Sequence, residues 1–349
     1  MGTFEDLAKA TGNKYVSKVS DGVDADVVNW IDTGSYALNA ILSGSIYGGL
    51  PSNKVTAFAG PASTGKSFYA LNIVKNFLDK NPKGAVFYFD TEQAITSELL
   101  ETRGIDTNRI FIVPVVTIEE FRTQAVRIIE GYLEIPEGKR EPMFMVLDSL
   151  GMLSTNKEVS DISAGKDTRD MTRTQLIKGA FRVLTLRLGK AGVALLLTNH
   201  TYETQEMYSQ TIMSGGTGPQ YAASTIIFLS KSKQKDASTN EVTGAIIKAK
   251  VNKSRFTVEN KSIPTLLDYQ KGLNKYYGLL EIAEKYGLVK KIANKYQFGD
   301  VTAFEKAIYK NPEKYFTKEL LDKIDEAVGL EFKYGSSQVE IEEEVEEDV

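Results

Sequence analysis

The chain has 349 residues, of which 42% are hydrophobic, and its formal net charge at pH 7 is −4. This length is enough for one large core with one or two small satellite domains, and the absence of cysteine excludes a disulfide framework and a thiolate metal site. No run of about 18 consecutive apolar residues occurs and the amino terminus lacks the apolar core of a signal peptide, so we expect a cytoplasmic protein that neither spans a membrane nor is secreted.

The first 30 residues contain one short helical candidate, at residues 4–10, and a regular alternation begins near Val55. Short runs of β-branched and aromatic residues alternate there with longer amphipathic stretches, which predicts an α/β fold with a mostly parallel twisted sheet. Several runs are apolar at consecutive positions, as in strands that helices cover on both faces. We expect strands at residues 55–60, 85–90, 109–113, 143–148, 193–199 and 225–230, with helices between them, for example at 66–80 and 117–134.

Two polar segments interrupt this alternation, at about residues 152–170 and 201–218. Neither has a helical or strand period, and long irregular loops inside a compact domain are usually functional or mobile. After about Gly278 the sequence becomes lysine-rich with a helical pattern. We therefore expect a core domain at residues 31–275 and a small helical C-terminal domain, without further strands, at residues 276–336.

Charge is unevenly distributed along the chain. The last ten residues hold seven acids, and without them the formal charge is +3. A basic body with an acidic tail, here residues 337–349, recurs in nucleic-acid-binding proteins, but an acidic terminus is more often only a solvated, disordered tail. Charge alone leaves both interpretations open.

A complete phosphate-binding motif follows the first predicted strand. GPASTGKS fulfils G-x-x-x-x-G-K-[ST] between a predicted strand and a predicted helix, which is the structural context that the motif requires. Its glycines allow successive N–H groups to face a polyphosphate, while Lys66 reaches the β and γ phosphates and Ser67 places a hydroxyl on Mg²⁺. The alternative is a glycine turn before a helix. We expect ATP and Mg²⁺ as ligands and the nucleotide contacts to be Gly60, Pro61, Ala62, Ser63, Thr64, Gly65, Lys66 and Ser67.

Further candidates lie at the ends of predicted strands. Asp148 ends the run MFMVLD and is a candidate for the acid that supports the magnesium ion. Glu92, just beyond the second strand, can orient or deprotonate an attacking water, and Asp90 competes for that role. His200, the only histidine, ends another strand where the second polar segment begins. A lone histidine is usually structural or exposed, but this position favours a function.

Taken together, these motifs resemble those of a known family. GPASTGKS, YFDTEQA, MVLDSLG and LLLTNH, in this order and spacing, resemble the ATPase core of RecA-type recombinases, as do the TGS and GGLP that precede the first of them. The stretch NHTYETQEMYSQTIMSGGTGPQY and the later KSR are more similar to the phage branch of that family than to its bacterial branch. The similarity covers residues 30–275 well, the C-terminal region more loosely and the first 30 residues weakly.

The resemblance implies roles for the nucleotide-site residues. Lys66 and Ser67 correspond to ligands of the nucleotide and of Mg²⁺, Asp148 to the acid behind the magnesium ion, and Glu92 to the carboxylate that activates water. His200 stands where bacterial members have a glutamine that senses the γ-phosphate, and a neutral imidazole N–H can donate the same hydrogen bond. We therefore expect catalytic roles for Glu92, Lys66 and His200.

The resemblance also implies contacts outside the nucleotide site. Lys253 and Arg255 match a basic pair that reaches the γ-phosphate of a neighbouring subunit in the active filament, like an arginine finger; the alternative is a solvated strand end. Leu99 occupies the position of a family tyrosine that stacks on adenine, which leaves base recognition open. The two polar segments coincide with the DNA-binding loops of the family, and the implied DNA contacts are Arg169, Arg173, Lys178, Arg182, Gly215 and Gly216.

The implied function is that of an ATP-dependent DNA recombinase. Such a DNA-dependent ATPase forms a helical filament on single-stranded DNA and pairs it with homologous duplex DNA for strand exchange in recombination, repair and recombination-dependent replication. Residues 1–30 would serve oligomerisation, the partners would include mediator and single-strand-binding proteins, and a phage member would act in the cytoplasm of its bacterial host. Two alternatives remain: a hexameric RecA-like helicase or motor that uses the same nucleotide residues, and a DNA-coating protein in which the nucleotide is a static cofactor.

Overall fold

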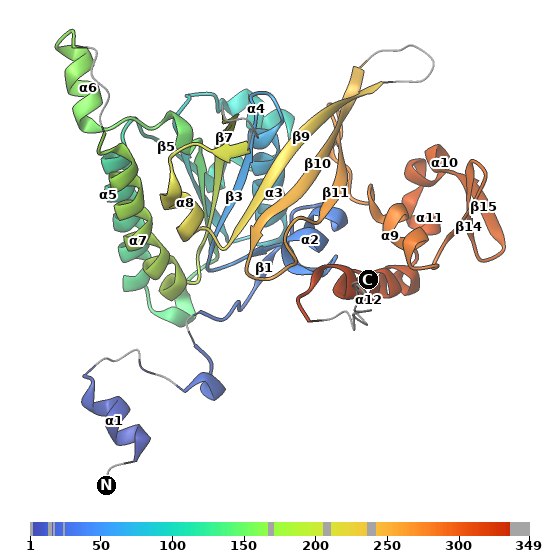
Figure 1. Cartoon of the computed structure of the whole chain (residues 1–349), viewed down its shortest axis with the longest axis horizontal. Helices are drawn as coiled ribbons and strands as arrows, with labels where there is room; N and C mark the ends of the chain where they lie inside the picture. The colour runs from blue at the N-terminus through green and yellow to red at the C-terminus, as the bar shows by residue number, and fades with distance from the viewer. Residues whose placement is uncertain are drawn as a thin grey trace, which may run out of the picture.

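The computed structural model describes residues 3–12, 16, 18–23, 25–166, 171–204, 211–235 and 242–335. Its centre is a large twisted sheet between helices, with a smaller C-terminal unit to one side (Figure 1). Among the described residues this sheet has ten strands, in the order β12-β11-β10-β9-β3-β7-β6-β4-β5 with β8 paired to β7. The strands are β3 (Val55–Gly60), β4 (Ala85–Asp90), β5 (Ile110–Pro114), β6 (Met143–Asp148), β7 (Ala194–Glu203), β8 (Thr211–Met213), β9 (Thr225–Lys235), β10 (Val242–Ser254), β11 (Ser262–Asp268) and β12 (Gly272–Leu273).

The centre of the sheet is parallel. β3 pairs in parallel with β7 and β9, β6 pairs in parallel with β7 and β4, and β4 pairs in parallel with β5 at the edge. β10, β11 and β12 extend the sheet beyond β9 in antiparallel fashion. The predicted α/β fold with a mostly parallel twisted sheet is therefore confirmed.

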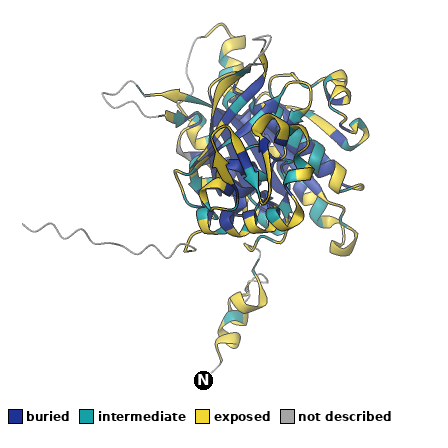
Figure 2. Cartoon of the chain, turned by 90° about the vertical axis from the view of Figure 1, so that its right-hand side faces the viewer, coloured by how far each residue is buried: buried dark blue, intermediate teal, exposed yellow. Residues whose placement is uncertain are grey.

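Alternate side chains of the central strands face two separate hydrophobic cores. Val55 and Ala57 of β3 pack into the core that contains side chains of α5 (Ile118–Glu134) and α7 (Arg173–Ala191). Phe58, the next residue of the strand, packs into the other core, which contains side chains of α2 (Tyr36–Ser43) and α3 (Lys66–Lys80). All six residues of β3 are buried, and the sheet interior is dark blue in Figure 2. Burial on both faces explains why these strands are apolar at consecutive positions.

The two polar segments contain more regular structure than the sequence predicted. In the first, Thr155 caps a helix: its side chain accepts a hydrogen bond from the backbone N–H of Glu158, which completes a capping box. In the second, β7 continues to Glu203 and pairs with β8. The shorter helices of the described chain are α1 (Phe4–Ala10), α4 (Ser97–Thr102), α6 (Asn156–Ser163) and α8 (Thr217–Ala222), with 3-10 turns at Val19–Asp21, Thr107–Arg109, Glu137–Lys139 and Leu150–Met152. β1 (Trp30–Ile31) and β2 (Leu50–Pro51) form a separate pair.

The C-terminal unit corrects one expectation. Its helices are α9 (Leu279–Lys285), α10 (Glu305–Lys310), α11 (Pro312–Tyr315) and α12 (Lys318–Phe332), but β13 (Lys290–Ile292), β14 (Lys295–Phe298) and β15 (Val301–Phe304) form a three-stranded antiparallel sheet between them. The expectation of no further strands was wrong. These strands are three or four residues long, too short to show an alternating pattern, and lysines stand in β13 and β14. The turns at Ala293 and Gly299 adopt positive φ angles of 51° and 58°. Within the described ranges, no helix combines the length and the hydropathy needed to cross a membrane.

Candidate active site

The phosphate-binding motif lies where β3 ends and α3 begins. Gly60 is the last residue of β3, and a Cβ there would lie 2.6 Å from the carbonyl oxygen of Leu229 on the neighbouring strand, so only glycine fits. Gly65 caps α3 with a φ of +93°, and Ser63 also has a positive φ, of 61°. Thr64 donates a hydrogen bond to the carbonyl of Pro61 at 2.9 Å. The loop therefore curls back on itself ahead of a 15-residue helix, and the N-terminus of a helix attracts anions.

Lys66 lies inside this curl. Its Nζ donates hydrogen bonds to the carbonyls of Gly60 at 3.0 Å and Pro61 at 2.9 Å. Burial lowers the pKa of Lys66, while the carboxylates of Asp148 and Glu92 oppose that shift. Ser67 is exposed on the same turn of α3. A buried ammonium, an exposed hydroxyl and a helix N-terminus are the donors that a polyphosphate with a magnesium ion requires, so the loop fits the expected ligands.

Asp148 stands at the end of β6 with both carboxylate oxygens engaged. Tyr88 donates to Oδ2 at 2.7 Å, and the hydroxyl of Thr198 donates to Oδ1. Burial, and then the charge of Asp148, raises the pKa of Tyr88 well above its ordinary value, so Tyr88 stays a donor. The sequence analysis missed Tyr88 and Thr198. The available signal was a polar atom at an interior position of an otherwise apolar strand.

Geometry separates the two acids that competed for the water-activating role. Asp90 is buried, and its two oxygens accept hydrogen bonds from the backbone N–H groups of Glu92 and Ile95, both at 3.1 Å. It therefore fixes the turn after β4. Glu92 extends beyond that turn, where its Oε1 accepts a hydrogen bond from the Ser149 hydroxyl at 3.1 Å. The arrangement favours Glu92 for work on a water molecule.

His200 joins this site to the second polar segment. It pairs with Gly60 across β7 and β3, and its Nε2 lies 3.9 Å from Oε1 of Glu92. The carbonyl of His200 accepts a hydrogen bond from the N–H of Ser214 at 2.9 Å, and the side-chain amide of Asn199 donates to the Ser214 carbonyl at 2.7 Å. One strand end therefore contacts both the acid beside the phosphate loop and the glycine-containing end of the polar segment.

Comparison with known proteins agrees with this geometry. Residues 2–274 match the RecA N-terminal domain. The chain belongs to the RecA family. It is 33% identical to the recombination and repair protein of Enterobacteria phage T4 over 82% of this chain and 72% of that protein. It is 26% identical to Protein RecA of Deinococcus radiodurans over 84% of this chain and 77% of that protein, and 25% identical to Protein RecA of Cytophaga hutchinsonii over 85% and 79%. The resemblance predicted from the motifs is confirmed.

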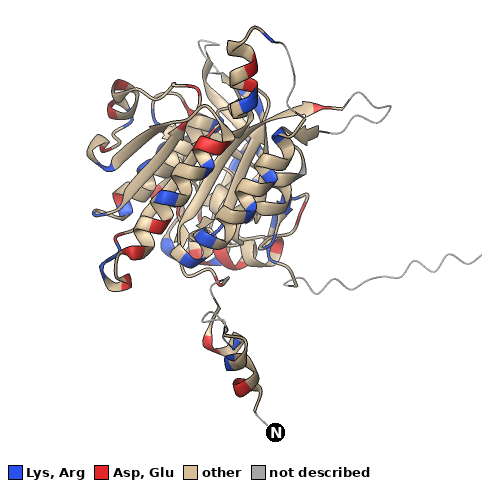
Figure 3. Ribbon diagram, turned by 90° about the vertical axis from the view of Figure 1, so that its left-hand side faces the viewer, with Lys and Arg blue, Asp and Glu red and all other residues tan. Residues whose placement is uncertain are grey.

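The residues that the RecA resemblance assigned to DNA lie along α7 and at the start of α8. Arg173 donates to the carbonyls of Leu153 and Gly151, both at 3.1 Å, and so ties α7 to the first polar segment. The Nζ of Lys178 lies 5.7 Å from the ring centroid of Tyr221. Arg182 lies one helical turn further along α7 and is exposed. In the ribbon of Figure 3, basic and acidic residues are interspersed along the helices on this side of the sheet. Arg169 lies outside the described residues.

Glycine is required where the second segment returns to α7. Gly215 and Gly216 have positive φ angles of 89° and 70°, and a Cβ on Gly216 would lie 2.7 Å from Cγ2 of Thr174. At Gly218 a Cβ would lie 3.0 Å from the backbone of Lys178. The backbone of this turn therefore packs directly against α7, beside the predicted DNA contacts.

Lys253 and Arg255 lie away from the phosphate loop of their own chain. Lys253 pairs with Ile226 of β9, and Ile226 pairs in turn with Ala57 of β3, three residues before Gly60. The Nζ of Lys253 donates to the carbonyls of Ala223, at 2.8 Å, and Gln220, at the end of α8. Burial, with the charge of Arg255, lowers the pKa of Lys253. Within one chain the pair does not join the nucleotide site.

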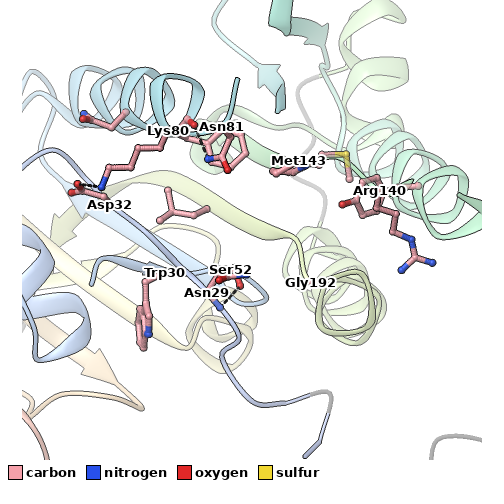
Figure 4. Close-up of a pocket in the computed structure, with 14 residues that line it drawn as sticks. Asn29, Trp30, Asp32, Ser52, Lys80, Asn81, Arg140, Met143 and Gly192 are labelled. Atoms are coloured by element: carbon pink, nitrogen blue, oxygen red, sulfur yellow. Dashed lines mark hydrogen bonds and ion pairs between the residues drawn. The ribbon is translucent and has the colours of Figure 1, made fainter. Parts of the chain in front are cut away.

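A hollow of about 430 Å³ lies elsewhere, between the β1–β2 pair and the far ends of α3 and α7 (Figure 4). Trp30, Asp32, Lys80 and Gly192 are among its lining residues, and Lys80 forms an ion pair with Asp32 at 2.6 Å. None of the described residues predicted for the nucleotide or DNA site lines it. It is therefore separate from the active site.

Proposed function

We propose that this protein is an ATP-dependent DNA recombinase that forms a filament on single-stranded DNA and carries out pairing and strand exchange with homologous duplex DNA. One observation carries the proposal: the end of β7 holds His200 beside Gly60 and Glu92 and is hydrogen-bonded to Ser214 at the edge of the glycine turn. This contiguity allows nucleotide state to bias a DNA-contacting segment. Membership of the RecA family supports the same assignment.

The ATPase chemistry follows from the side chains around the loop. Lys66 and the N-terminus of α3 would hold the β and γ phosphates, and Ser67 and Asp148 would hold magnesium, which neutralises phosphate charge when bound. Glu92 would accept a proton from, or orient, the attacking water. Tyr88 and Thr198 keep Asp148 fixed as a hydrogen-bond acceptor, so its charge faces the site without reorganisation.

Filament formation is supported by surfaces that one chain leaves uncovered. β5 is an edge strand, and Phe111 and Ile112 on it are 50% and 37% exposed. The N-terminal helix α1 buries no residue of its own, and Phe4 is 87% exposed. Exposed edge strands and apolar side chains favour association with another chain. In such a filament Lys253 and Arg255 would act on the nucleotide of the neighbouring subunit, since they are remote from their own.

The first test is removal of the phosphate-binding cation. Lys66→Ala is expected to abolish ATP hydrolysis, measured with single-stranded DNA present, because it removes the buried ammonium that lies inside the loop against the carbonyls of Gly60 and Pro61. Parental turnover in that variant would overturn the site assignment.

For the unaltered protein, strand exchange between homologous DNAs without duplex unwinding identifies a recombinase. Unwinding without exchange would instead identify a helicase, and DNA binding without any ATP turnover would identify a static coating protein.

A further inference from the structure

Arg103, outside the site described above, holds its charge in an unusual environment. It follows α4, it is half-buried, and its guanidinium carbon lies 4.4 Å from the ring centroid of Phe68. Its Nε is buried and has no hydrogen-bond partner among the described residues. Burial alone lowers the pKa of Arg103, without help or opposition from a neighbouring charge. A desolvated cation without a carboxylate costs free energy, which points to a ligand on this side chain.

Phe68 connects Arg103 to the phosphate loop. It is the residue after Ser67, on the first turn of α3, and it is half-buried although the next residue, Tyr69, is fully buried. It belongs to the outer stripe of α3, with Asn72 and Lys75 at helical spacing. A nucleotide whose terminal phosphates lie between Lys66 and Glu92 must extend its nucleoside the other way, past this first turn.

Other elements of the fold lie on both sides of the first part of α3. On one side, Leu99 of α4 and Phe68 both pack against the same hydrophobic core. On the other side, Gly272 brings the β11–β12 turn to α3, where its Cβ position lies 3.4 Å from Oδ1 of Asn72. Leu99 is aliphatic and has no π face, so the planar groups on the α4 side are the Phe68 ring and the Arg103 guanidinium that lies over it, while the exposed Tyr269 ring belongs to the β11–β12 turn on the other side.

We propose that the base of the bound nucleotide stacks on the free face of the Arg103 guanidinium, so that Phe68, Arg103 and the base form three layers. Guanidinium planes stack on aromatic rings on either face. This assignment rests on the proposed function, because it requires ATP in the phosphate loop.

The experiment compares two ligands with the full-length protein and Mg²⁺: a non-hydrolysed ATP analogue, and inorganic tripolyphosphate, which has no base. Calorimetry gives both dissociation constants for the parent, Arg103→Ala, Arg103→Lys and Phe68→Leu. Lys75→Ala is the matched control, because it removes a cation from the same stripe of α3 and that cation pairs only with Asp79 among the described residues. The Arg103→Ala variant should bind the ATP analogue about tenfold more weakly and tripolyphosphate unchanged, while the control binds both like the parent.

The remaining variants make the outcome decisive. Lysine keeps the charge but lacks the plane, so Arg103→Lys should bind the ATP analogue as weakly as the alanine variant. Phe68→Leu should show the same ligand selectivity, and it serves as the test if Arg103→Ala fails to fold. Equal weakening for both ligands, or parental affinity in Arg103→Lys, would overturn the stacking assignment. If the parent binds neither ligand, the proposed function itself has failed.

Discussion

In the proposed function, His200 is the residue that would couple nucleotide and DNA most directly. Its side chain faces Glu92, while its backbone carbonyl binds Ser214 at the glycine turn. Space around the imidazole is limited, because a Cβ on Gly151 would lie 3.3 Å from its Cδ2. The imidazole therefore lies between Glu92 and the backbone just before the first polar segment, while its own strand is bonded to the second, so a contact with the γ-phosphate would act next to both segments.

We expect His200→Ala to leave nucleotide binding largely intact, because Lys66, Ser67 and the loop backbone remain. The variant should lose most of the tightening on single-stranded DNA that ATP produces relative to ADP. A coupling of about 1 to 3 kcal/mol, roughly 5- to 150-fold in affinity, is typical of such linkage. The measurement is DNA affinity with ADP and with an ATP analogue at one salt concentration.

A glutamine at this position is the informative control. Its amide offers a donor at similar reach, so His200→Gln should restore part of the ATP-dependent tightening. Linkage is reciprocal, so DNA should also lose its effect on ATP affinity in the alanine variant. If His200→Ala keeps the parental ratio between the two nucleotide states, His200 is only a structural neighbour and another residue carries the coupling.

At the scale of single residues, the sequence predicted the parts of the site that a contiguous motif or strand end defines. GPASTGKS, Asp148, Glu92 and His200 all lie at carboxyl ends of the parallel strands, where such a sheet collects its ligands. The choice between Asp90 and Glu92 needed hydrogen bonds that spacing does not contain. Arg103 was not predicted at all, because its partner Phe68 is 35 positions away in the chain and no local pattern links them.

At the scale of elements, α12 is fastened to the rest of the chain by three acids. Glu331 accepts hydrogen bonds from Lys261, at 2.6 Å, from Lys285 and from Tyr286, at 2.9 Å, and its side chain is only 12% exposed. Asp325 accepts from the hydroxyl and the backbone around Ser45, and Asp322 from Tyr47, each at 2.7 Å. The helix therefore clasps the segment that leads into β2.

We expect this clasp to make stability depend on pH. Its hydrogen bonds lower the pKa of Glu331 from 4.5 to about 2, against the effect of burial. A depressed carboxyl pKa stabilises the fold fully above 4.5, and this contribution is lost as pH falls from about 4.5 to about 2. Glu331→Gln should therefore lower the free energy of unfolding at pH 7 by roughly 1 kcal/mol, measured by urea titration, and the difference from the parent should shrink toward pH 2.

The matched control for this clasp is Glu319, which pairs with Lys323 on the exposed side of the same helix with 80% of its side chain exposed. Glu319→Gln should change stability little at any pH. A gap between Glu331→Gln and the parent that stays constant from pH 7 to pH 3 would show that the carboxylate charge contributes nothing and that only side-chain shape matters.

Elements were predictable where burial imposes a pattern. β3, β4 and β6 agree with their predicted bounds because burial on both faces requires continuous apolar runs. β10 and β11 went unpredicted: β10 alternates buried and exposed residues and carries lysines on its exposed side, so it resembles a polar stretch until β9 is placed beside it. The same reasoning applies to β13–β15, whose pairing depends on turns rather than on hydrophobic period.

For the molecule as a whole, charge segregation is the property that a sequence shows and a fold does not change. The chain carries −4 overall and +3 without its last ten residues. The tail at residues 337–349 lies outside the described residues, but it is covalently attached to a body whose formal charge is positive. Such a tethered polyanion competes with DNA phosphates for the same lysines and arginines.

We therefore expect deletion of residues 338–349 to tighten DNA binding, more for duplex than for single strands because duplex has the higher charge density. Counterion release makes the logarithm of affinity fall with the logarithm of salt concentration by about 0.9 per duplex phosphate neutralised, so the truncated chain should show a steeper salt slope. Filter binding or anisotropy over a salt series measures both quantities.

The control keeps the tail length but replaces its seven acids with glutamine or asparagine. If charge competition is the cause, this neutral tail should bind DNA as tightly as the truncation does. Affinity that stays at the parental value in the truncated chain at low salt would mean that the tail does not compete with DNA, and tightening by truncation but not by neutralisation would assign the effect to the bulk of the tail.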